Sequence, residues 1–134
     1  MSTLVTQTVQ SKTSGPPVFK NSSGTEKGQL VKAWANIETS TTTNPGGSKT
    51  INGSFNISSC TDIDEGKHQI TFTSAFDDVK YCVVATTGHN DMTDNANATA
   101  EVREISTTGF KIVCEGVDEG YIDRDKLYIA VFSA

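Results

Sequence analysis

Apolar and polar residues alternate with a period of two in one segment after another between residues 28 and 134. This spacing is typical of β-strands that bury one face, because successive side chains of a strand point to opposite sides. Residues 81–86 are apolar on both faces and therefore indicate a central strand. The predicted strands are residues 30–37, 49–58, 59–63, 68–74, 81–86, 99–105, 110–115 and 127–132.

Turn-forming residues separate these segments. Residues 64–66 (Asp-Glu-Gly) predict a tight turn, and residues 107–109 (Thr-Thr-Gly) predict a β-hairpin. Longer polar loops are predicted at residues 39–47, 88–97 and 116–125. About eight short strands joined in this way predict an all-β fold, an antiparallel β-sandwich of jelly-roll-like type.

The composition agrees with one β-rich domain. The chain has 134 residues, which is enough to bury a core without disulfides or metals. Thr, Ser, Asn and Gly are abundant, only 35% of the residues are hydrophobic, and long runs with helical spacing are absent. We therefore expect residues 28–134 to form the β-sandwich head.

Residues 1–27 differ from the head and predict an extended arm and linker. The adjacent Pro16 and Pro17 favour an extended conformation, and a segment this short cannot bury enough surface to fold alone. It has neither the basic start nor the apolar core of a signal peptide. The residues expected to dock onto a partner are Leu4, Val5, Val9, Pro16, Pro17 and Phe19.

The net charge argues against a nucleic-acid partner, and the length of the apolar segments argues against a membrane span. Sixteen acidic residues against 11 basic ones give a net charge of -5. Nucleic-acid binding needs clustered cations, so we expect no nucleic-acid partner. No segment approaches the roughly 18 consecutive apolar residues of a membrane span, so we expect no membrane insertion.

Catalytic motifs are missing from the sequence, which contains no nucleophile elbow, no zinc-protease motif and no phosphate-binding loop. His68 alternates with apolar residues, which predicts a histidine at the core edge or at an interface. A dyad of Cys82 with His68 lacks the electropositive setting that activates a thiol. We therefore expect no enzyme, no catalytic residue and no cofactor. Cys60, Cys82 and Cys114 are expected to be buried free thiols.

Two polar loops are the candidate binding sites. Residues 89–95 and 118–125 are rich in oxygen ligands, but neither has the residue order of a calcium loop, so we expect turns without a metal. Loops carry recognition more often than cores do, and Tyr and Arg are favoured at recognition surfaces. The candidate receptor-binding residues are His89, Asn90, Asp91, Asp94, Asn95, Tyr121 and Arg124.

Several blocks of the sequence resemble one family. Residues 31–36 (VKAWAN), 54–59 (SFNISS), 70–73 (ITFT), 81–84 (YCVV) and 110–112 (FKI) occur in the order found in a β domain of bacteriophage tail fibres, including those of cyanobacterial phages. The resemblance covers about residues 30–134 and lacks a long fibre shaft. It implies a virion protein that forms a homotrimer, and an arm that docks onto other phage tail or virion proteins.

Two residues are candidates for the trimer interface. Leu30 and Trp34 share one face of the first predicted strand with the polar Lys32 and Asn36. An aromatic residue on such a mixed face is typical of an interface anchor, although a core tryptophan fits the pattern equally well. The three-fold symmetry itself is implied only by the resemblance.

Three alternative functions stay open. A carbohydrate-binding β-sandwich would use the same two loops to grip a glycan. A capsid decoration protein or a tail adaptor would fit the short chain. A fibre-borne depolymerase would need two carboxylates at catalytic spacing in a groove, and no segment indicates them. If receptor contact occurs on this chain, we expect it at residues 88–97 and 116–125, with a host surface glycan or protein.

Overall fold

A computed structural model describes residues 19–20, 23, 26–28, 31–39, 43–90, 98–117 and 120–133. Within these residues every regular element is a β-strand, and no helix is long and apolar enough to cross a membrane. Two short strands, β1 (Phe19–Lys20) and β2 (Glu26–Gly28), pair antiparallel with each other. Of the residues expected to dock, only Phe19 is described; Leu4, Val5, Val9, Pro16 and Pro17 lie outside the described residues, as does Leu30.

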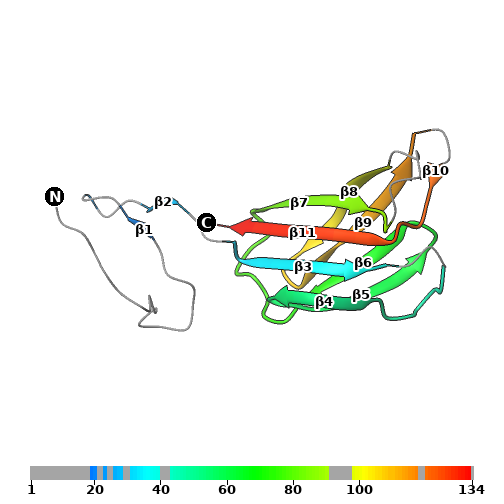
Figure 1. Ribbon diagram of the computed structural model, residues 1–134. Helices are drawn as coiled ribbons and strands as arrows, with labels where there is room; N and C mark the ends of the chain where they lie inside the picture. Colours follow the sequence, from blue (N-terminus) through cyan, green and yellow to red (C-terminus); the bar gives the residue numbers. More distant parts are fainter. Residues whose placement is uncertain are drawn as a thin grey trace.

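Two antiparallel sheets pack against each other in the head (Figure 1). The front sheet has the order β4-β3-β11-β7, and the rear sheet contains β5, β6, β8, β9 and β10. In the rear sheet β9 lies between β8 on one side and β6 with β10 on the other. The predicted β-sandwich is therefore confirmed. The strands are β3 (Ala33–Glu38), β4 (Thr50–Phe55), β5 (Ile57–Asp64), β6 (Lys67–Phe72), β7 (Tyr81–Gly88), β8 (Ala98–Ser106), β9 (Gly109–Gly116), β10 (Gly120–Tyr121) and β11 (Lys126–Ser133).

The core lies between the two sheets and follows the period of two that the sequence shows. Inward residues of β3 and β11 face inward residues of β5, β6 and β9. Phe72, Tyr81 and Phe110 form an aromatic cluster, and the Tyr81 hydroxyl donates to the carbonyls of Ser106 and Gly109 at 2.9 and 3.0 Å. The buried apolar residues are Ala33, Ala35, Ile37, Ile57, Cys60, Ile70, Phe72, Tyr81, Phe110, Ile112, Val113, Cys114, Leu127, Ile129 and Val131.

The two ends of the sandwich differ in what they carry. β3 begins and β11 ends at one end, which we call the terminal end (Figure 1). The opposite end, which we call the loop end, carries the β3–β4, β5–β6, β7–β8, β9–β10 and β10–β11 connections. The described residues of the predicted loops 39–47, 88–97 and 116–125 therefore lie at one end of the sandwich, opposite the start of β3.

Two predicted strand assignments are wrong. Residues 49–58 were expected to form one strand, but the chain turns at Asn56, which has a φ of 53°, and passes from the front sheet to the rear sheet. The Asn56 side chain holds this turn, since its Oδ1 accepts from Ser74 N at 2.8 Å. Residues 81–86 were expected in a central strand, but β7 lies at the edge of the front sheet.

Candidate functional site

A buried ion pair stands at the loop end. Asp62 points into the sandwich from β5, and its Oδ2 lies 3.0 Å from Lys49 Nζ; the two side chains are 0% and 7% exposed. The same oxygen accepts from the backbone N of Asn44 at 2.6 Å. Asp62 also exchanges backbone hydrogen bonds with Gly46 and Gly47. The ion pair therefore fixes the end of the β3–β4 connection against β5.

A second carboxylate joins three connections. Asp123 precedes β11 and is 7% exposed. Its Oδ1 accepts from Gly66 N in the β5–β6 turn at 2.7 Å, and its Oδ2 accepts from Thr43 Oγ1 in the β3–β4 connection at 2.7 Å. Carboxylates that accept hydrogen bonds from the backbone are well suited to holding a turn in one conformation. Asp62 and Asp123 thus make the described part of the loop end one connected structure.

Three of the predicted receptor residues meet around Asp125. Arg124 Nη1 lies 2.5 Å from His89 Nε2, and His89 Nδ1 lies 3.1 Å from Asp125 Oδ2. Because arginine can only donate, Nε2 accepts, and Nδ1 carries the proton that is donated to Asp125. Asn90 N donates to the same Asp125 oxygen at 3.0 Å. This set of contacts joins the β7–β8 connection to the β10–β11 connection.

The expectation of an exposed recognition arginine is wrong for Arg124. Arg124 is only 2% exposed, and its backbone carbonyl accepts a hydrogen bond from the hydroxyl of the buried Thr39. Arg124 is therefore buried, and it joins the described starts of the β7–β8 and β3–β4 connections through His89 and Thr39. Tyr121 does lie at the surface, 41% exposed, but on β10 of the rear sheet, with Lys67 Nζ 4.2 Å from its ring centre. Asp91, Asp94 and Asn95 lie outside the described residues.

The sequence pattern does not identify Asp62, Asp123 or Asp125 as the residues that organise the loop end. The acidic composition of residues 118–125 favours solvated turns when the sequence is taken alone. Asp62 had a clearer signal, because it occupies a core-facing position two residues after Cys60 in a strand of period two. A carboxylate at such a position needs a buried partner.

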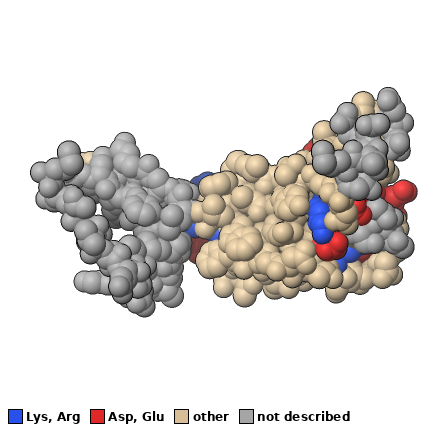
Figure 2. Space-filling model, viewed as in Figure 1, with Lys and Arg blue, Asp and Glu red and all other residues tan. Residues whose placement is uncertain are grey.

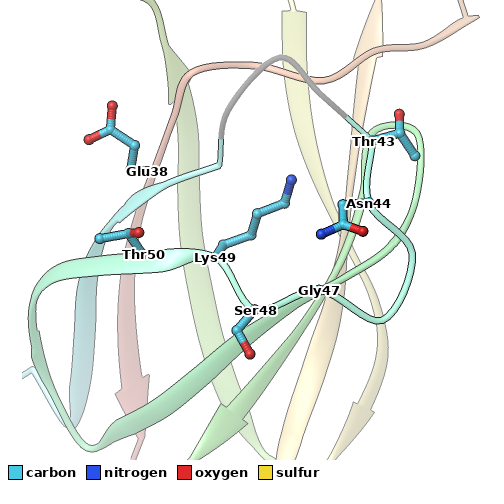
Figure 3. A pocket seen from close by; sticks show the side chains of 7 residues that line it. All are labelled: Glu38, Thr43, Asn44, Gly47, Ser48, Lys49 and Thr50. Atoms are coloured by element: carbon cyan, nitrogen blue, oxygen red, sulfur yellow. The ribbon is translucent and has the colours of Figure 1, made fainter.

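A shallow depression of about 430 Å³ opens beside the ion pair of Lys49 and Asp62. In Figure 3 Lys49 extends from the start of β4 toward the segment that carries Asn44. The Lys49 ammonium is paired with Asp62, and the lining also contains the carboxylate of Glu38, which is paired with Lys126. The lining residues are Glu38, Thr43, Asn44, Gly47, Ser48, Lys49 and Thr50. The contacts of Lys49 and Asn44 with Asp62 hold the β3–β4 connection in place.

His68 is fully buried in β6, opposite Asp62 of β5 in the strand register. Burial lowers the pKa of His68 below its usual value of 6.5, and nearby Lys49 acts in the same direction, while the carboxylates of Asp62 and Asp123 oppose the shift. The sequence placed this histidine at the core edge or at an interface, and the structure places it inside the core.

The free energy of unfolding should therefore decrease as the pH falls from about 7 to about 5, because unfolding exposes an imidazole that then binds a proton. The native state excludes this proton until the pH reaches the lowered pKa of His68, so stability is complete above 6.5 and is lost below it. Urea titrations across this range measure the slope. The variant His68→Leu should flatten the slope, and an unchanged slope in that variant would show that another group titrates.

The outer faces of the two sheets differ in how their charged and apolar side chains are grouped. The rear sheet carries ion pairs, among them Arg103 with Glu101 at 2.7 Å and with Glu115 at 3.4 Å. The front sheet instead exposes large apolar side chains: Trp34 (43%), Phe55 (50%), Val84 (58%), Tyr128 (41%) and Phe132 (37%). We call this set, together with Cys82 and Ala130, the front face. Trp34 therefore lies at the surface and not in the core.

The cysteines also divide between core and front face. Cys60 and Cys114 are free and buried as expected, and burial raises the pKa of their thiols to about 12 and about 11. The expected burial of Cys82 is wrong, since this free thiol is exposed. Tyr81 takes the inward position at the start of β7, so its neighbour Cys82 points outward.

Comparison with models of protein families, with curated proteins and with solved structures found no match. The resemblance to a phage fibre domain therefore stays a prediction.

Proposed function

We propose that this chain is a structural protein of a bacteriophage particle, a tail-fibre-type homotrimer that attaches to the tail through residues 1–27. The observation that carries the proposal is the division of the head into a terminal end and a loop end. Residues 1–27 precede β3, which begins at the terminal end. An attachment made there leaves the loop end farthest from the particle.

The contacts of the loop end support a role in presenting a surface. Asp62, Asp123 and Asp125 tie together the bases of connections that come from both sheets. Binding residues are commonly carried on loops that a rigid scaffold positions. Receptor contact with a host glycan or protein would then use residues 88–97 and 116–125, which the contact between His89 and Arg124 ties together.

The same contacts support a function without catalysis. Asp62 and Asp123, the buried carboxylates of the loop end, each accept hydrogen bonds from backbone N–H groups. A general acid or base must instead reach a substrate proton directly. We therefore propose that these groups stabilise the loop end and that the protein acts by binding and assembly.

Immunogold labelling of purified particles of the encoding phage tests this proposal. Antibodies raised against residues 28–134 should label the tail, and particles made with a chain that lacks residues 1–27 should lose this label. Label spread over the capsid would favour a decoration protein instead. Particles without any label would remove the virion assignment and leave the carbohydrate-binding alternative, which a glycan array would test.

A further inference from the structure

The front face is a continuous apolar surface built from four strands. The strand register places Phe55, Trp34, Ala130 and Val84 in one row across β4, β3, β11 and β7. Tyr128 stands next to this row on β11, toward the loop end, and Phe132 stands beside Cys82 on its other side. Strands lie about 4.8 Å apart, so side chains in one row touch their neighbours.

The front face also lacks charge. Figure 2 shows it tan over most of its width, with Lys, Arg, Asp and Glu gathered near the loop end and at the opposite margin. The pair Lys126–Glu38, 2.7 Å apart, marks the boundary toward the loop end, and Lys32 precedes β3 on the other side. A solvent-facing sheet normally alternates apolar inside and polar outside. The exposed apolar residues of the rear sheet, Ile63, Ile105 and Tyr121, lie on three strands that do not pair with one another, whereas those of the front sheet share a row of paired strands.

The exposed area fits a protein interface. With surfaces of roughly 150–250 Å² for each large aromatic side chain, the four aromatics and Val84 expose about 400–500 Å². This is the size of the largest apolar patch on a typical monomer, and such patches are commonly functional. A standard interface buries about 800 Å² per partner, so these five side chains would supply more than half of it.

We propose that the front face packs against other copies of this chain. This inference rests on the homotrimer in the proposed function and names the surface by which it forms. Around a three-fold axis, an uncharged apolar face can lie against two neighbouring copies without placing like charges together, whereas the chain as a whole carries a net charge of -5 that opposes contact elsewhere. With a three-fold axis that runs along the strands, copies joined at this face also have the starts of their β3 strands at one end.

Cys82 is a native probe of this contact. It lies on the front face, while the other two thiols, Cys60 and Cys114, are 0% and 1% exposed. In an uncovered head, alkylation with iodoacetamide should modify one cysteine per chain at the rate of an exposed thiol. In the assembled protein we expect modification of Cys82 to be at least tenfold slower.

The first measurement is the mass of the full chain by light scattering, together with the rate of Cys82 alkylation. We expect three times the 14.3 kDa chain mass and a protected Cys82. A mass of one chain with a reactive Cys82 would overturn the proposal. A mass of one chain with a protected Cys82 would overturn it as well, because another part of the same chain would then cover the face.

Variants locate the contact. Val84→Lys places a charge in the row beside Ala130, and because Val84 is 58% exposed the fold does not depend on it. We expect this variant to fall to the mass of one chain. The control Val117→Lys changes an equally apolar residue that is 73% exposed and lies after β9 of the rear sheet, and it should keep the assembled mass. Assembly that survives both Val84→Lys and Trp34→Lys would place the interface elsewhere.

The measurements of mass and alkylation test the interface, and the labelling of particles tests the virion role, so the two proposals can fail independently. A chain that assembles through the front face but is absent from particles would remove the virion role and leave the interface. A chain that labels the tail but keeps an exposed Cys82 would leave the virion role and remove the interface.

Discussion

Replacing Lys49 by methionine should lower the free energy of unfolding by about 3–5 kcal/mol, because it leaves the carboxylate of Asp62 buried without its cation. The methylene stem of lysine is replaced by a side chain of similar length, so packing changes little. The lost contact is the 3.0 Å pair whose side chains are 0% and 7% exposed. Urea denaturation at neutral pH measures the change.

A matched control is the variant Lys80→Met. Lys80 also pairs with an aspartate, Asp78, but at 3.7 Å and with side chains 85% and 50% exposed. Water screens this pair, so its loss should change stability by less than about 1 kcal/mol. The double variant Lys49→Met/Asp62→Asn should recover part of the loss, since it removes the buried charge and keeps an acceptor for Asn44 N. Equal effects of Lys49→Met and Lys80→Met would contradict the buried ion pair.

Replacing Gly66 by alanine should cost more than about 3 kcal/mol, because a positive φ and a close backbone approach add together. Gly66 has a φ of +65°, and an added Cβ would lie 2.7 Å from both Cys114 O and Ile122 N. These backbone groups cannot move away freely. Ile122 N donates to Cys114 O at 3.0 Å, and Cys114 N donates to Gly66 O at 2.7 Å.

The variant Gly46→Ala separates the two contributions. Gly46 has a φ of +82°, but no atom of the described structure would lie within 4 Å of the added Cβ. It should therefore show only the cost of the left-handed conformation, roughly 1–2 kcal/mol. Thermal or urea unfolding of both variants gives the difference. If Gly66→Ala costs no more than Gly46→Ala, the turn must be able to move away from β9.

Local chemistry made most of the strands and turns predictable. The alternation around Ala33, Ala35 and Ile37 identified the buried face of β3, and the Asp-Glu-Gly and Thr-Thr-Gly sequences identified two turns that the structure contains. These signals depend only on near neighbours in the sequence. The partition of strands between two sheets depends on distant pairing, so the break at Asn56 was missed.

The same dependence on distant pairing explains why the predictions for Cys82 and Arg124 were wrong. A strand that is apolar on both faces is either central or exposes an apolar face to a partner, and the period of two does not distinguish these cases for β7. Cys82 was therefore expected in the core. Arg124 was assigned to an exposed loop because its contacts with His89 and Thr39 come from residues 35 and 85 positions away.

The place of β11 in the front sheet has a consequence for how the protein is made. β11 is the last strand of the chain, yet it lies between β3 and β7 and pairs with both along nearly its whole length. The front sheet therefore cannot close while residues 126–133 are still inside the ribosome. Until residues 126–133 have emerged, β3 and β7 have no central partner, and folding must wait for a contact between the first and last strands of the front sheet. Such long-range pairing is slow, on a scale of milliseconds to seconds. Subunits that join through the front face would then assemble only after residues 126–133 of each chain have been synthesised.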